Sequence, residues 1–494
     1  VERGALPPLP DDAPRPAVLP AQPPAQARRL APLDELQRDV DALLAAPSLQ
    51  PTTWGVLVKS LSRDETIYAL NAGKLLLPSS TMKVLTLAVA AERLGWDFTY
   101  ETSLVGGGRI ANGVLDGPLV VVGRGDPTID NWDGAASRLF EDWAGELKAA
   151  GVRTVTGNLI GDDNAFDDEP LGAGWMWDDL DRSFATGVGA LQFNENTAQL
   201  TIAPGSNVGD SAIVTAAPAG AALVLHSQVT TGASGTPAAL STERLPGSAT
   251  LEVRGSVPLG ARPIVRNTAA LNPTLYFANE LRSALVASGI EVRGTAMDID
   301  DVPGRPSSIA GTTLVEHRSP PLSEMAATMM KLSQNLYAET LLKTIGMADG
   351  IPTATGGIGA VRSVLAGWGV AGYTQADGSG LSRYNVATPE ALVAVLAHVE
   401  RDETLGPTFR SVLPIAGLDG TLEARMKGTP AEGNARAKTG TMTGARAMAG
   451  FLTTADGEPL VFSIVGNNFG DGVETTAAAA IDAVVVRLAR FSRR

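Results

Sequence analysis

The most chemically distinctive residues in the sequence are a serine and a lysine three positions apart, at the start of an apolar run. Ser80 and Lys83 belong to PSSTMKVLTLAVAAERLG (78–95), which predicts a buried helix that begins after the proline and ends at the glycine. Positions i and i+3 share one face of a helix, so the two side chains can be neighbours. Burial disfavours an ammonium, and a neutral amine can take the proton of a hydroxyl. Alone, the pair could equally be a helix cap and a surface lysine.

Two more short motifs follow, and each occurs once in the chain. The S-x-N motif at 333–335 lies between two helical runs, where it could serve only as a junction cap. The K-T-G motif at 438–440 begins a strand-like run, where it could be an exposed strand end. Of the eight lysines, only Lys83 has a serine three positions before it. The occurrence of all three motifs, once each and in this order, favours a shared chemical role.

Composition and charge argue against several other kinds of chemistry. The net charge of −14 makes nucleic acid an unfavourable partner. The chain has no cysteine, which excludes thiol nucleophiles, thiolate metal sites and disulfides. There is no G-x-S-x-G motif, and none of the three histidines belongs to a recognisable motif, so a Ser-His-Asp hydrolase and a histidine zinc site are poorly supported. We therefore predict no metal and no cofactor.

The order of patterns along the chain predicts how the motifs are positioned. Strand-like runs at 52–62 and 65–77 precede the first motif, and three more span 434–468, followed by a terminal helix over 472–491. A helical pattern at 32–49 precedes all of them. We expect one antiparallel sheet built from both chain ends, with the terminal helices on one of its faces.

With 494 residues the chain is too long for one ordinary core, and we expect two or three domains. The middle of the chain is rich in valine, threonine and glycine and predicts a β-rich insertion. No run is apolar and long enough to span a bilayer. The predicted division is a Pro/Ala-rich tether (1–33), a discontinuous α+β catalytic domain (34–102 and 300–494) and an insertion (103–299) with two subdomains (103–128 with 183–299, and 129–182).

The three motifs in this order resemble those of the penicillin-recognising serine acyltransferases, the penicillin-binding proteins and serine β-lactamases. The 253 positions from Ser80 to Ser333 exceed what a compact β-lactamase needs. This long insertion is similar to that of the penicillin-binding protein 4-type D-alanyl-D-alanine carboxypeptidase/endopeptidases, the class C low-molecular-mass, S13 group. GRGDPT, GWMWDDL, HRSPPLSEM and DGSGLSR extend the resemblance from about residue 50 to the C-terminus. Gln334 departs from it, because the family commonly has aspartate there.

The resemblance implies a transpeptidase-type α+β fold and a role for each motif residue. Ser80 is expected to attack a D-Ala-D-Ala-type carbonyl, Lys83 to act as its neutral base and Ser333 to relay a proton to the leaving amine. Asn335 is expected to hold Lys83 and the substrate amide. Lys438 is expected to supply a permanent positive field that keeps Lys83 neutral and attracts the substrate carboxylate.

Further residues are implied as substrate contacts. The hydroxyls of Thr439 and Thr441 are expected to donate to the carboxylate, and the backbone N–H groups of Ser80 and Thr441 to form the oxyanion hole. Arg383 could meet an anionic part of the peptide, or be an ordinary surface arginine. Asp178 could meet a side-chain ammonium, or belong to an ordinary acidic loop. The complete set of expected substrate contacts is Trp175, Trp177, Asp178, Ser379, Leu381, Arg383, Thr439, Gly440, Thr441 and Thr443.

The expected activity is that of a serine carboxypeptidase/endopeptidase that acts on peptidoglycan peptides and is covalently inhibited by β-lactams. A β-lactamase is the nearest alternative, although no Y-x-N motif is present. An esterase or D-amino-acid amidase, and a cell-wall-binding protein without activity, are the others. The resemblance implies an extracytoplasmic location. The first residues lack a signal-peptide pattern, so we expect such a peptide to have been removed already, unless the chain never had one.

Overall fold

The computed structural model of the chain describes residues 31–494. The predicted tether at 1–33 lies outside the described residues except for its last three. Pro32 already begins helix α1 (Pro32–Leu44), where its fixed backbone angle suits the first turn. No helix of the described part is both long and apolar enough to cross a membrane.

The central sheet is antiparallel and is built from both ends of the chain. Its strand order is β2-β1-β22-β21-β20, and β1 pairs with β22 along its length, with Thr53 opposite Asn467. This confirms the α+β arrangement expected from the sequence. The strands are β1 (Thr53–Ser60), β2 (Thr66–Leu70), β20 (Arg436–Met442), β21 (Ala445–Thr453) and β22 (Pro459–Asn467).

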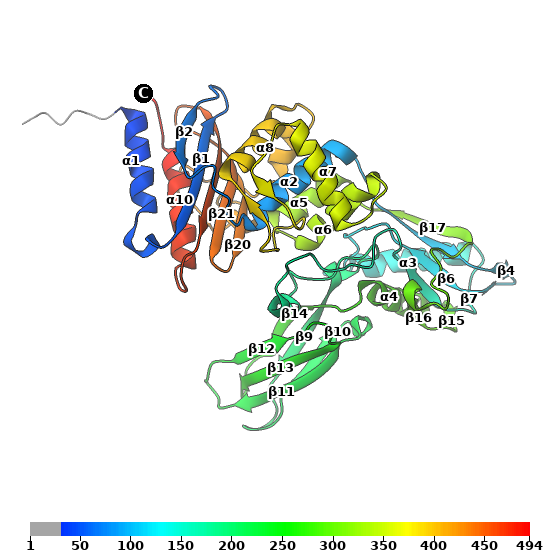
Figure 1. Cartoon of the computed structure of the whole chain (residues 1–494). Coiled ribbons are helices and arrows are strands. Elements are labelled where there is room, and N and C mark those ends of the chain that lie inside the picture. Colours follow the sequence, from blue (N-terminus) through cyan, green and yellow to red (C-terminus); the bar gives the residue numbers. More distant parts are fainter. Residues whose placement is uncertain (1–30) are drawn as a thin grey trace, which may run out of the picture.

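Helices cover both faces of this sheet, so its central strands are apolar on both sides. Phe462 of β22 packs into an apolar cluster with α1 and α10 (Glu474–Ala489), whereas its neighbour Val461 belongs to the cluster on the other face. That second cluster is formed mainly by the helices of the helical region described next. Figure 1 shows α1 and α10 side by side on one face, with α8 and α2 across the sheet.

The helical region supplies the first two motifs. Its elements are α2 (Lys83–Leu94), α5 (Leu322–Lys331), α6 (Asn335–Ala348), α7 (Ala354–Gly367), α8 (Pro389–Arg401) and α9 (Gly406–Val412), with the short pair β18 (Tyr373–Thr374) and β19 (Val386–Ala387). The nine residues from Lys83 to Ala91 are all buried. This buried part of α2 therefore has no solvent-facing polar side, whereas Glu92 and Arg93 at its end are exposed.

The predicted first helix begins differently from the expectation. A short 3-10 helix, η2 (Ser79–Met82), precedes α2, and Ser79 has a left-handed backbone with φ +49°. The Thr81 N–H and hydroxyl both donate to the Pro78 carbonyl, at 3.2 and 2.7 Å. This tight turn places Ser80 at the exposed mouth of the helix while Lys83 is already enclosed.

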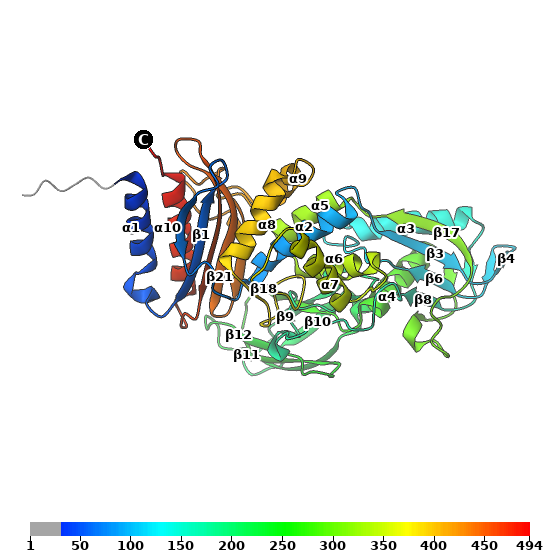
Figure 2. The same cartoon turned by 45° about the horizontal axis from the view of Figure 1, so that its top comes forward.

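The insertion forms two lobes, and Figure 2 shows both beside the helical region. The first lobe contains β3 (Glu101–Gly106), β4 (Arg109–Ala111), β5 (Val114–Asp116), β6 (Leu119–Val122), β7 (Thr154–Val155), β8 (Leu159–Asp162), β15 (Glu291–Val292), β16 (Ala296–Asp298), β17 (Thr312–Arg318), α3 (Ala135–Ala149) and α4 (Pro273–Ala287). The second contains β9 (Thr197–Ala203), β10 (Ile213–Ala217), β11 (Val224–Gly232), β12 (Ala239–Glu243), β13 (Thr250–Pro258) and β14 (Ile264–Ala269).

The subdomain limits expected from the sequence stay a prediction, and the apolar clusters group the insertion in another way. Residues 197–269 have their own apolar cluster around Leu200, Val229 and Leu251, whereas 129–182 shares a core with the remaining strands. Strand β17 extends the first lobe to Arg318. The catalytic-domain and insertion boundaries stay a prediction, and the apolar clusters favour a division at 197–269.

A segment of the first lobe, residues 163–188, is fastened to the helical region by buried polar contacts. The Lys343 ammonium of α6 donates to Asp167 Oδ1 at 2.6 Å and to the Glu169 carbonyl at 2.8 Å. The Trp175 indole N–H donates to Asp377 Oδ2 at 3.0 Å. The segment therefore has a fixed position relative to α6, although it belongs to the insertion.

Replacing Lys343 by methionine should release this segment. The apolar stem is retained, but the Asp167 carboxylate and the Glu169 carbonyl lose their charged donor, so backbone amides in 167–188 should exchange hydrogen about 10-fold faster. Hydrogen-exchange mass spectrometry measures this directly. The matched control is Lys427→Met, because Lys427 is exposed. Unchanged exchange in 167–188 would contradict the proposed anchoring.

Candidate active site

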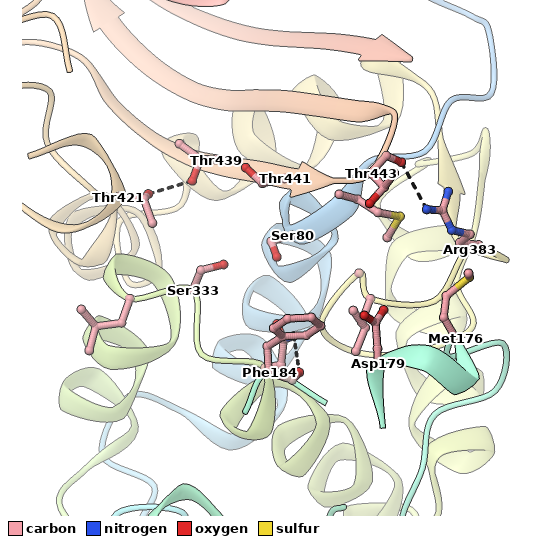
Figure 3. Close-up of a pocket in the computed structure, with 15 residues that line it drawn as sticks. Ser80, Met176, Asp179, Phe184, Ser333, Arg383, Thr421, Thr439, Thr441 and Thr443 are labelled. Carbon is pink, nitrogen blue, oxygen red and sulfur yellow. Dashed lines mark hydrogen bonds between the residues drawn. The ribbon is translucent and has the colours of Figure 1, made fainter. Parts of the chain in front are cut away.

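The three motifs meet at one cavity of about 410 Å³ between the sheet, the helical region and the insertion. Ser80, Ser333, Asn335, Thr439 and Thr441 all line it. In Figure 3 Ser80 lies in the middle, with Thr421 and Thr439 on one side and Met176, Asp179 and Arg383 on the other. Residues 253 positions apart in the sequence therefore face the same space.

Lys83 has three polar neighbours and no exposure to solvent. Its Nζ lies 3.2 Å from Ser80 Oγ, 2.6 Å from Asn335 Oδ1 and 2.9 Å from the Ser379 carbonyl oxygen. A neutral amine has two N–H donors and one lone pair. When the two donors bind Asn335 and Ser379, the lone pair is left for the Ser80 hydroxyl proton, which is the geometry of a general base.

The surroundings of Lys83 decide its charge. Burial lowers the pKa of Lys83 to about 7. The Glu339 and Asp377 carboxylates act in the opposite direction and raise it. Glu339 is itself buried and accepts the N–H groups of Gly378 and Ser379 at 2.9 and 2.8 Å. Burial, followed by the Asp377 carboxylate, raises the pKa of Glu339. A substantial fraction of Lys83 is therefore neutral near pH 7.

Lys438 is as deeply buried as Lys83. Its Nζ donates to Ser333 Oγ at 2.9 Å and to the Thr439 carbonyl at 2.8 Å. Burial lowers the pKa of Lys438 well below its ordinary value, and the nearby Lys83 ammonium lowers it further. The sequence analysis expected Lys438 to carry a permanent charge. In this buried position the charged form needs an anion in the cavity to stabilise it.

Strand β20 presents its threonines to the cavity because alternate residues face the same side. Thr439 and Thr441 line the wall, and Thr443 lies just beyond the strand's end. Gly440 faces the other way, against the turn that precedes Ser80. A Cβ on Gly440 would lie 2.6 Å from the Pro78 carbonyl oxygen, so glycine is required for this close approach.

Asn335 is held from both ends of its amide. Its Oδ1 accepts from Lys83, and its Nδ2 donates to the Phe184 carbonyl of the insertion at 2.7 Å. Gln334, the departure from the family pattern, caps α6: its Oε1 accepts the Leu336 N–H at 3.3 Å. Burial raises the pKa of Glu195, and a hydrogen bond with Gln334 opposes this. The departure at Gln334 therefore still supplies a side-chain cap to α6.

The residues expected as substrate contacts in the acidic aromatic segment do not line the cavity, but two of their neighbours do. Trp175 points to Asp377, and Trp177 is 53% exposed. Neither they nor Asp178 lines the cavity, whereas the neighbours Met176 and Asp179 do. Of the other expected contacts, Leu381 and Arg383 line the cavity, and Ser379 acts through its carbonyl.

Asp179 and Arg383 give the same end of the cavity opposite charges. Burial raises the pKa of Asp179, and the Asp178 carboxylate adds to this, while the Arg182 and Arg383 guanidinium groups oppose it. Arg383 Nη2 donates to the Thr443 carbonyl at 3.2 Å, which keeps it beside β20. This end can therefore receive a polar group of either charge.

The lining residues that were not predicted from the sequence are Met176, Asp179, Phe184, Leu332, Gly380, Thr421 and Met442. Met176 and Asp179 are sequence neighbours of the predicted Trp175, Trp177 and Asp178. The segment was therefore identified correctly, but the side chains that face the cavity were not. Phe184 acts through its backbone and Thr421 lies in a loop without a motif, so neither had a local signal. Among residues 31–494, no cluster of three or more acidic, histidine or cysteine side chains is arranged to hold a metal ion.

Comparison with known proteins gives consistent matches over most of the chain. The sequence profile of the D-Ala-D-Ala carboxypeptidase 3 (S13) family matches residues 36–488. A D-alanyl-D-alanine carboxypeptidase of an Actinomadura species is 35% identical, over 93% of this chain and 85% of that protein. The crystal structure of penicillin binding protein 4 from Haemophilus influenzae superposes with a TM-score of 0.81 at 29% identity, covering 91% of this chain and 98% of that one. The same protein complexed with a novel β-lactam gives a TM-score of 0.75 at 27% identity, with the same coverage.

The reactivity of Ser80 should follow the neutral fraction of Lys83. We expect the second-order rate constant for acylation by benzylpenicillin to rise with pH through about 7 and then level off, because below that pKa Lys83 is an ammonium that has no lone pair. Stopped-flow or gel-based acylation kinetics measures the profile. Lys83→Arg, which keeps its charge, should react at no pH. A rate constant that is unchanged from one pH unit below this pKa to one above would contradict the assignment.

Proposed function

The chain belongs to the D-Ala-D-Ala carboxypeptidase 3 (S13) family, and on this premise we propose that it is a serine D-alanyl-D-alanine carboxypeptidase/endopeptidase. It cleaves peptidoglycan stem peptides through an acyl-enzyme and is acylated by β-lactams. The observation that carries the proposal is the buried amine of Lys83, 3.2 Å from Ser80 Oγ, in a cavity that also contains Ser333 and Thr439.

In the acylation step Ser80 Oγ bonds to the carbonyl carbon of the penultimate D-alanine, and Lys83 takes the hydroxyl proton. The carbonyl oxygen becomes an oxyanion that the N–H groups of Ser80 and Thr441 stabilise, where one such donor is typically worth about 3–4 kcal/mol. When the C–N bond breaks, the Ser333 hydroxyl gives its proton to the leaving amine and is reprotonated by Lys83, which becomes neutral again. Water then attacks the ester carbonyl carbon while Lys83 takes one of its protons. The bond from that carbon to Ser80 Oγ breaks, and Lys83 returns the proton to Ser80 Oγ.

The charges of Lys83 and Lys438 are coupled, because two neighbouring buried ammonium groups repel each other. A substrate carboxylate near Lys438 supplies a counter-charge, which favours the ammonium form of Lys438. A charged Lys438 in turn disfavours a second ammonium on Lys83. Substrate binding therefore favours the base form of Lys83 at the moment when it is needed.

The direction of the peptide follows from the charges of the cavity. Lys438, Thr439 and Thr441 attract the terminal carboxylate, so the leaving group lies at that side of Ser80. The stem peptide then extends toward Asp179 and Arg383. We further propose that the protein acts outside the cytoplasm, because its peptidoglycan substrate lies there.

Replacing Ser80 by alanine should abolish both D-alanine release and labelling by fluorescent penicillin, because no other hydroxyl lies at the Lys83 lone pair. The matched control is Ser79→Ala: Ser79 is buried, and its hydroxyl has no hydrogen-bond partner among the described residues. The control should retain both activities. A Ser80→Ala protein that still releases D-alanine would contradict the proposal. Rapid turnover of nitrocefin by the unaltered protein would favour a β-lactamase instead.

Asp178 and Asp179 allow a test of where the stem peptide binds in the cavity. Asp179→Asn should raise KM by about 10-fold for peptides whose diamino acid has a free amine, because a charge-assisted hydrogen bond is lost. Acetylation of that amine should remove the difference between the variant and the unaltered protein. Asp178→Asn is the control, since Asp178 does not line the cavity. A larger effect from Asp178 than from Asp179 would contradict the placement.

A further inference from the structure

We propose that Thr421 is a positioning residue for the leaving group's carboxylate, and that it acts by orienting the hydroxyl of Thr439. This inference rests on the proposed function and adds a residue that none of the three motifs contains. Thr421 lies in the short 3-10 helix η7 (Gly420–Leu422) and lines the cavity on the Thr439 side of Ser80 (Figure 3).

The central contact joins two hydroxyl groups. Thr439 Oγ1 donates to Thr421 Oγ1 at 2.7 Å, the usual distance for a hydrogen bond between hydroxyl groups. Thr439 is nearly buried, whereas Thr421 is exposed at the cavity rim. Thr439 also follows Lys438, whose Nζ donates to the Thr439 carbonyl and to the Ser333 hydroxyl. The residue that contacts Thr421 through its side chain therefore contacts Lys438 through its backbone.

This contact matters because a hydroxyl can rotate and has only one proton. Each hydroxyl donates once and accepts through two lone pairs. When a carboxylate enters, Thr439 can turn its proton toward the anion and accept the proton of Thr421 instead. Such a chain of donors polarises Thr439 and makes it a stronger donor to the negative charge. Without Thr421, the Thr439 hydroxyl has no hydrogen-bond partner among residues 31–494 to fix its direction.

The loop that carries Thr421 is held against the element that carries Ser333. Lys331, at the end of α5, forms an ion pair with Asp419, and Asp419 Oδ1 also accepts the Ile415 N–H at 2.8 Å. Gly420 has φ +56°, and a Cβ there would lie 2.7 Å from the Lys331 carbonyl oxygen. The end of α5 therefore positions Ser333 and Thr421 together.

The test compares two ligands that differ in the carboxylate alone: benzylpenicillin and its methyl ester. Thr421→Val keeps the side-chain shape and removes the hydroxyl. We expect it to lower the second-order acylation rate constant for benzylpenicillin about 5-fold and to leave that for the ester unchanged. Thr421→Ser, which keeps the hydroxyl, should restore the acid-to-ester ratio. Thr429→Val, on the same loop but outside the cavity, is the matched control.

The outcomes separate this inference from the proposed function. An unchanged acid-to-ester ratio in Thr421→Val overturns the role of Thr421, whether both rate constants fall equally or neither falls. A ratio lowered equally by Thr429→Val also overturns it, because the effect is then that of the loop. If benzylpenicillin does not acylate the unaltered protein at Ser80, the proposed function fails, and this inference fails with it.

Discussion

The proposed chemistry depends on keeping one amine neutral at the buried start of helix α2. The Lys83 Nζ has no solvent to hydrate an ammonium, and its two acceptors, Asn335 and Ser379, match the two N–H groups of the neutral form. In the proposed mechanism, the apolar core around α2 that stabilises the fold also sets the charge of the base, Lys83.

Acidic groups near Lys83 limit how far burial can lower its pKa. Glu339 and Asp377 favour its ammonium form, yet both are needed to shape the turn that offers the Ser379 carbonyl. Asp377 accepts the Gly380 N–H of the same peptide unit that accepts from Lys83. The two carboxylates therefore position the Ser379 carbonyl and also oppose the effect of burial on Lys83. The resulting pKa of Lys83 is about 7.

The insertion contributes to the site although it separates the motifs in sequence. Its Phe184 carbonyl holds Asn335, and Met176 and Asp179 form the wall opposite β20. Lys343 and Trp175 fasten this segment to the helical region. A long insertion in the chain is therefore a fixed wall of the cavity, at the end where we propose that the stem peptide lies.

The sequence by itself determined the three motifs, the sheet built from both chain ends and the family. These depend on residue type, spacing and periodicity, which are local properties. Only the tertiary structure decided that Asp179 rather than Asp178 faces the cavity, that burial lowers the pKa of Lys438, and that Thr421 contacts Thr439. The reason is physical: exposure, pKa and hydroxyl direction depend on neighbours brought from distant segments, and no local pattern records them.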